Sequence, residues 1–136
     1  MISCVVNQLC DVELSGPERK LLSRGLREWG GPAHCSEAMA VALGFEGTES
    51  LLRDGAHLAK RISDGEPLSR EDWTRALMAT EVVFISDVIG SGVDWISTTE
   101  YTDAETIQAL RTIQHKLVAV VLRPGKTGDV PGWLSR

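Results

Sequence analysis

Residues 68–92 read LSREDWTRALMATEVVFISDVIGSG, and this stretch decides the fold class. Ser69 can cap a helix, and Leu68 before it can pack on Trp73 at the fourth helical position, a hydrophobic staple. Apolar residues then occur on most sides of the helical wheel, a pattern typical of a helix that other helices surround. We therefore predict a central apolar helix near residues 70–89, ended by the two glycines that follow.

Two further stretches carry the same start signal. Ser15 stands three residues before Glu18, and Thr102 three residues before Glu105. In such a capping box the hydroxyl and the carboxylate each accept from a free amide at the helix N-terminus. The helices predicted besides 70–89 run roughly over 16–29, 36–43 and 48–65, and from 102 to just before the Arg123-Pro124-Gly125 stop. The chain is thus predicted to be all-α, a compact single-domain bundle of about five helices.

The two ends of the chain are less regular. Residues 1–14 are an uncertain lead-in, in which Cys4-Val5-Val6 is either a short strand or unsettled chain, and residues 126–136 form a loosely attached tail. Within the helices, Gly25 and Gly55 each cost about 1 kcal/mol relative to alanine. We expect a close helix crossing to compensate at either position.

Composition limits the class of protein. The chain has 136 residues, 43% hydrophobic and 24% charged, which is ordinary for one globular domain that folds without a metal or a disulfide. No apolar run approaches the length of a transmembrane helix, and Met1-Ile2-Ser3-Cys4 does not begin a secretory signal. We therefore expect a cytoplasmic protein with no membrane association.

The cysteines point the same way. Cys4, Cys10 and Cys35 are odd in number and lack C-x-x-C spacing, so we predict three reduced thiols. A zinc site from these cysteines and His34 would need an unusual backbone, because His34 and Cys35 are adjacent. We predict neither a metal nor a cofactor.

Charge is unevenly distributed along the chain. The net charge is −5, but residues 66–105 hold nine acids against two bases, a net of −7, whereas residues 106–136 carry +4. An acidic segment repels phosphate and attracts basic partners at a rate that salt lowers.

The acidic segment contains the candidate binding surface. One loop between the two strongest helices holds two acids and two aromatic residues, and further acids lie just before and after it; the set is Asp87, Asp94, Trp95, Glu100, Tyr101, Asp103 and Glu105. Trp and Tyr are favoured anchors at protein interfaces, and carboxylates steer a basic partner toward them. The alternative is that Trp95 folds back to plug the loop and that the acids are merely solvated.

Catalysis has weaker support. Glu81 and Asp87 fall within the predicted apolar helix, where burial would raise their pKa values as a general acid requires. Their six-residue spacing does not place them side by side, so a partner group such as Arg111 must come from elsewhere. No serine, cysteine or histidine stands in a recognised nucleophile setting. An enzyme or small-ligand binder would use a pocket between the fourth and fifth predicted helices, with Glu81, Asp87 and Arg111 as polar groups.

Residues Ser36 to Ile62 resemble a helix-turn-helix, with Ala40 and Gly44 where that family places its small residue and its turn glycine. The resemblance implies a DNA-binding regulator. The sequence departs from the pattern because the expected apolar residue of the second helix arrives one place late, at Leu51. The would-be recognition helix also opens with acidic and neutral residues rather than with bases.

The leading hypothesis is therefore protein binding. We expect a small acidic protein that covers a basic partner, in the specific form of an inhibitor or immunity-type protein for a partner such as a nuclease toxin. The small-ligand pocket and the DNA-binding regulator remain the alternatives, with nucleic acid the least favoured partner.

Overall fold

The helices begin at the residues that the capping signals predict. The computed structural model describes residues 2–4, 9–31, 33–92 and 94–122, with the side chains described from residue 9 onward. Its helices are α1 (Gly16–Arg27), η1 (Glu28–Gly30, a 3-10 turn), α2 (Glu37–Ala42), α3 (Thr48–Ser63), α4 (Arg70–Ile85), α5 (Trp95–Thr99) and α6 (Asp103–Val121). The prediction of an all-α bundle is confirmed, with the short η1 and α5 as additions. The predicted tail, 126–136, lies outside the described residues.

Both capping boxes form as predicted. The Ser15 hydroxyl accepts from the Glu18 amide while the Glu18 carboxylate accepts from the Ser15 amide, and Thr102 and Glu105 repeat this exchange. Helix α3 starts differently. The amide of Thr48 donates to the Glu37 carboxylate of α2 at 3.2 Å, so a side chain from the preceding helix caps it. Hydrogen bonds from the Thr48 hydroxyl and amide lower the pKa of Glu37.

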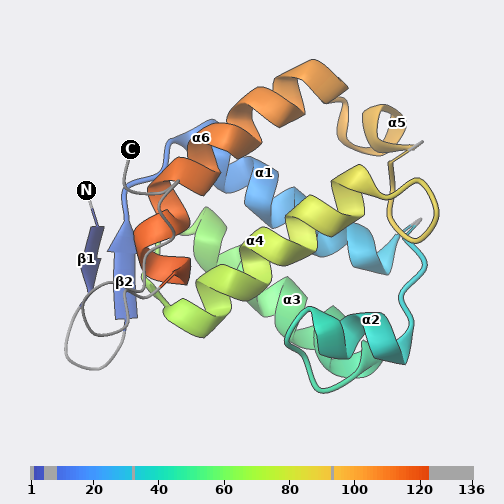
Figure 1. Cartoon of the computed structure of the whole chain (residues 1–136), viewed down its shortest axis with the longest axis horizontal. Coiled ribbons are helices and arrows are strands. Elements are labelled where there is room, and N and C mark those ends of the chain that lie inside the picture. The colour runs from blue at the N-terminus through green and yellow to red at the C-terminus, as the bar shows by residue number, and fades with distance from the viewer. Residues whose placement is uncertain (1, 5–8, 32, 93, 123–136) are drawn as a thin grey trace.

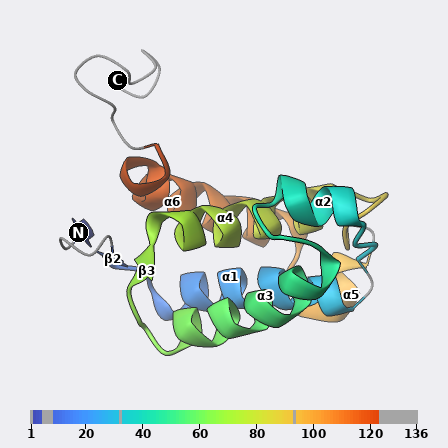
Figure 2. The same ribbon diagram turned by 90° about the horizontal axis from the view of Figure 1, so that it is seen from below.

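The helices form two layers (Figure 1, Figure 2). Figure 2 shows α1 and α3 side by side in one layer, with α4 and α6 in the other. Helix α1 packs against α3, α4 and α6, so it shares the central position with α4, as Figure 1 also shows. The largest fully buried side chains are Trp73 and Trp95. The Trp73 indole donates to the Cys10 carbonyl at 2.9 Å, which ties the start of α4 to the N-terminal segment.

Gly25 marks the point where α1 crosses α4. A methyl group at this position would overlap the Oγ1, Cβ and Cγ2 atoms of Thr80, which is fully buried. The predicted close crossing is therefore confirmed at Gly25. Gly55 differs, because an added Cβ would lie 3.9 Å from its nearest neighbours, an ordinary contact.

Helix α4 is shorter than predicted. It ends at Ile85 rather than near residue 89, because the Ser86 backbone turns extended and its hydroxyl accepts from the amides of Val88 and Ile89. The chain then folds back, and the Ser91 amide donates to the Val83 carbonyl at 2.6 Å. Gly90 is required here, since a Cβ would come within 2.5–2.8 Å of the carbonyl oxygens of Val82 and Val83 in α4 and of Ser86 just after it.

A small antiparallel sheet covers the opposite end of the bundle. Its strands β1 (Ile2–Cys4), β2 (Leu9–Val12) and β3 (Leu68–Ser69) lie in the order β1-β2-β3. The predicted lead-in is thus partly a strand, although Val5 and Val6 lie outside the described residues. The register places the backbone of Cys4 opposite that of Cys10.

The prediction of three reduced thiols is wrong, because Cys10 is disulfide-bonded. Cys35 is free. The error arose because the spacing of the cysteines gave no sign of the β1–β2 pairing, which brings residues six apart in sequence to facing positions. None of the helices in the described part of the chain has the length and apolar character needed to cross a bilayer.

Candidate protein-binding surface

The end of the molecule opposite the sheet is built from residues 86–105, which we call the acidic end. It comprises the turn after α4, the short helix α5 and the first turn of α6, and Figure 1 shows these segments gathered beyond the end of α4. The turn is fixed to the body by the Ser91 hydroxyl, which donates to the buried Glu28 carboxylate at 3.2 Å. Arg24 of α1 also donates to the Thr98 carbonyl of α5.

The carboxylates of the acidic end are exposed and have no ion-pair partner among the described residues. All five predicted acids, Asp87, Asp94, Glu100, Asp103 and Glu105, are exposed. The ion pairs observed between described residues lie elsewhere, on α1 and η1, on α3 and the loop after it, at the start of α4 and in the second half of α6. Only Glu105 is engaged by the fold, because the Thr102 amide and hydroxyl hydrogen-bond to its carboxylate and lower its pKa.

The two aromatic residues are not exposed anchors. Trp95 is fully buried, packs edge-to-face on Phe84 and donates to the Thr106 hydroxyl at 2.8 Å. The expectation that Trp95 presents itself to a partner is therefore wrong, and the alternative that it plugs the loop is correct. Tyr101 is half-buried, and its hydroxyl is buried without a hydrogen-bond partner in the described part of the structure.

The large apolar side chains that are exposed near the acidic end are aliphatic rather than aromatic. Seven large hydrophobic residues of the described chain are exposed, and four of them lie in or beside the acidic end; these are Ile85, Val88, Ile96 and Ile107, exposed by 68%, 80%, 52% and 46%. The predicted binding set contains none of these four residues, because residue type alone does not tell an exposed aliphatic side chain from a buried one. The signal was present in the four-residue spacing of Asp103, Ile107 and Arg111, which puts an isoleucine between two charges on one helix face.

A groove lies between α4 and α6 beside the acidic end. It encloses about 190 Å³ and is lined by Glu81, Phe84, Ile85, Ile107, Leu110, Arg111 and Gln114. Gln114 donates to Glu81 at 2.6 Å and accepts from Arg111 at 2.9 Å, so it links the two charged side chains. The structure thus brings Glu81 and Arg111 to one cavity, as the small-ligand hypothesis requires. It does not bring Asp87, which lies exposed in the turn because α4 ends early.

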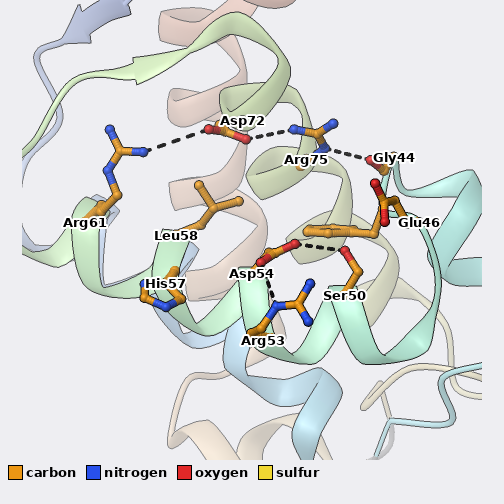
Figure 3. Close-up of a pocket in the computed structure, with 11 residues that line it drawn as sticks. Gly44, Glu46, Ser50, Arg53, Asp54, His57, Leu58, Arg61, Asp72 and Arg75 are labelled. Carbon is orange, nitrogen blue, oxygen red and sulfur yellow. Dashed lines mark hydrogen bonds and ion pairs between the residues drawn. The ribbon is translucent and has the colours of Figure 1, made fainter.

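A second cavity, of about 350 Å³, lies between α3, α4 and the turn after α2 (Figure 3). Figure 3 shows Asp72 between Arg61 and Arg75, with N···O distances of 3.9 and 2.8 Å. Arg75 also donates to the Gly44 carbonyl at 2.7 Å and lies over the Phe45 ring. This cavity could not be predicted from the sequence, because its residues come from three separate segments.

The charges of this second cavity are already paired. Asp54 accepts from Ser50 at 2.8 Å and from Arg53 at 3.2 Å, and these two hydrogen bonds lower its pKa. Each arginine in the lining therefore has a carboxylate of the same molecule as its partner. The network ties α3 to α4 and leaves no excess of positive charge for an anionic ligand.

The same pairing bears on the helix-turn-helix resemblance. Helix α2 and helix α3 are joined by a turn in which Gly44 has a φ of 96°. The cations of α3, however, all face acids: Arg53 pairs with Asp54, Lys60 with Asp64, and Arg61 with both Glu66 and Asp72. A helix that reads DNA needs basic side chains that are free to contact phosphate. This surface does not favour DNA binding.

In the described residues no group of three or more His, Cys, Asp or Glu side chains is placed to hold a metal ion.

Comparison with known proteins identifies no relative: no family model, no curated protein and no solved structure matches the chain. The case for function therefore depends on the surface itself.

Proposed function

We propose that this protein acts by binding another protein, and that the acidic end is the surface that meets a basic partner. The observation that carries the proposal is the contrast in pairing. Five carboxylates of the acidic end are exposed without an ion pair in the described chain, whereas ion pairs are frequent on α1 and α3. Apart from Glu105, which belongs to the capping box of α6, these carboxylates make no hydrogen bond or ion pair in the described chain, so they are available to steer and hold a partner.

The specific form of the proposal is an inhibitor, or immunity-type protein, for a basic partner such as a nuclease toxin. A protein that binds nucleic acid offers a cationic surface to phosphate. Carboxylates grouped at one end of a rigid helical body could occupy that surface and block it. The exposed Ile85, Val88 and Ile107 add apolar area beside the charges, which steering alone would not require.

The compartment in which binding takes place is a separate question. Disulfides persist mainly in oxidising compartments. The disulfide at Cys10 therefore argues against the predicted cytoplasmic location.

Affinity purification from the native host tests the proposal. The variant Asp94→Lys/Glu100→Lys should lose a stoichiometric basic partner that the unmodified protein recovers. The matched control, Asp11→Lys/Glu71→Lys, makes the same change in net charge on exposed acids of β2 and the start of α4, far from the acidic end (Figure 1). The control should recover the partner as the unmodified chain does. Equal recovery by both variants, or no stoichiometric partner at all, would refute the proposal.

A further inference from the structure

The groove between α4 and α6 has the form of an anchor pocket. Phe84 and Leu110 form its floor and are each 5% exposed, whereas Ile85 and Ile107 form its walls and are largely exposed. Each helix contributes residues three and four apart, so the groove runs between two regular helix faces. A partner can thus bury new apolar area on a surface that the fold has already shaped.

The volume of the groove limits the size of the group that can occupy it. Binding sites for small molecules usually enclose about 300–1,000 Å³. At about 190 Å³ the groove is smaller than that range. A pocket of this size suits one large apolar side chain, the kind of residue that anchors protein interfaces in desolvated pockets.

A polar network links the two helices at one part of the groove. Glu81 and Arg111 stand on opposite helices, and Gln114 hydrogen-bonds to both at 2.6 and 2.9 Å. Another part leads to the acidic end of the molecule. There Asp87 follows Ile85 by two residues, and Asp103 precedes Ile107 by one helical turn.

Charge decides which partner can fill the groove. A second copy of this chain would bring its own unpaired carboxylates against Asp87 and Asp103, and an anionic membrane would be repelled in the same way. A segment that carries lysine or arginine beside its anchor residue would instead complement both acids.

We infer that the groove binds one large apolar side chain of the partner, flanked in the partner by lysine or arginine. The inference rests on the proposed function, since it names the element of the basic partner that the protein recognises. It also assigns Ile85 and Ile107, rather than Trp95, as the apolar contacts of the interface.

Titration of the isotopically labelled protein with synthetic peptides tests the inference by NMR. The probe is a lysine-rich amphipathic helical peptide with one central tryptophan, used up to about 1 mM, at which even weak complexes are detected. Its counterpart has alanine in place of the tryptophan. We expect the tryptophan peptide to shift the amide signals of residues 81–85 and 107–114, and to bind at least tenfold more tightly than the alanine peptide.

Protein variants separate the groove from charge alone. Ile107→Lys should weaken binding of the tryptophan peptide at least tenfold, whereas Val41→Lys, a matched change at an exposed residue of α2, should not. If both peptides bind equally and Asp94→Lys/Glu100→Lys abolishes both, the groove inference is wrong and the proposed function stands. Failure of the tryptophan peptide to bind, or binding that Ile107→Lys leaves unchanged, also overturns the inference.

Discussion

Two regions of this protein differ in how many of their carboxylates form ion pairs, although Glu49 of α3 and Glu71 of α4 also form none with a described residue. On α1, η1 and the start of α4, the acids Glu18, Glu28 and Asp72 are bound by cations of the same chain. At the acidic end, Asp87, Asp94 and their neighbours have no cation among the described residues. Glu18 and Asp72 link separate helices, whereas the carboxylates of the acidic end contribute no ion pair to the described part of the fold. The number of acids in a stretch of sequence thus says less about function than their pairing does.

The largest expected effect concerns the aromatic residue of the acidic end. Replacing Trp95 with alanine should lower the free energy of unfolding by about 3–5 kcal/mol, because a fully buried indole leaves a cavity. Trp95→Phe should cost less, since it keeps the ring against Phe84 but loses the hydrogen bond to Thr106. Urea denaturation measures both. If Trp95→Ala left stability unchanged, Trp95 would belong to the binding surface after all.

Two glycine variants test how closely α1 packs against α4. Gly25→Ala should destabilise the protein by about 1–3 kcal/mol, because the new methyl group overlaps Thr80 at the α1–α4 crossing. Gly55→Ala serves as the control in α3, where the added group makes only ordinary contacts. There the better helix propensity of alanine should stabilise the protein by about 0.5–1 kcal/mol. Equal effects in thermal denaturation would contradict the assigned crossing.

How much of this arrangement the sequence predicts depends on how local each feature is. Ser15, Ser69 and Thr102 cap helices through residues three positions away, so their starts could be read directly. The end of α4 could not, because it depends on a chain reversal that brings Ser91 back to Val83. The burial of Trp95 likewise depends on packing against Phe84 from another helix. The acidic residues can be identified from the sequence. Whether they have ion-pair partners can be judged only when the positions of the surrounding cations are known.

The paired acids should give the protein a pH-dependent stability. Burial alone would raise the pKa of Glu18, but hydrogen bonds from Lys116 and from the Ser15 amide and hydroxyl outweigh it and lower the pKa below its ordinary value of 4.5. A carboxyl with a depressed folded pKa stabilises the protein above its unfolded pKa, and this stabilisation is lost as the pH falls through the folded pKa.

Glu18→Gln should therefore cost roughly 1 kcal/mol near neutral pH and less in acid, so that the two unfolding curves converge as the pH falls through the lowered folded pKa of Glu18. Glu105→Gln provides the comparison, because Glu105 occupies the same capping position without a lysine and is exposed. Its effect should be smaller. A difference between the unmodified chain and Glu18→Gln that did not change with pH would contradict this account of Glu18.

A smaller gain in stability is expected within the acidic end. Glu100 has a φ of 66°, a left-handed conformation that glycine adopts without cost. Glu100→Gly should therefore stabilise the protein by about 0.5–1 kcal/mol, whereas Glu100→Gln removes the charge and keeps the strain. The difference between these two variants in urea denaturation isolates the backbone effect, and no difference would show that residue 100 is not strained.

Neutralising each group of carboxylates tests the central claim most directly. The triple variant Asp54→Asn/Asp64→Asn/Asp72→Asn removes paired acids, and Asp87→Asn/Asp94→Asn/Glu100→Gln removes unpaired ones. The first should lower the free energy of unfolding by roughly 1–2 kcal/mol, and the second should leave it unchanged or raise it by a few tenths as self-repulsion falls. A loss in the second variant as large as in the first would show that the acidic end serves the fold, and would contradict its assignment as a surface for a partner.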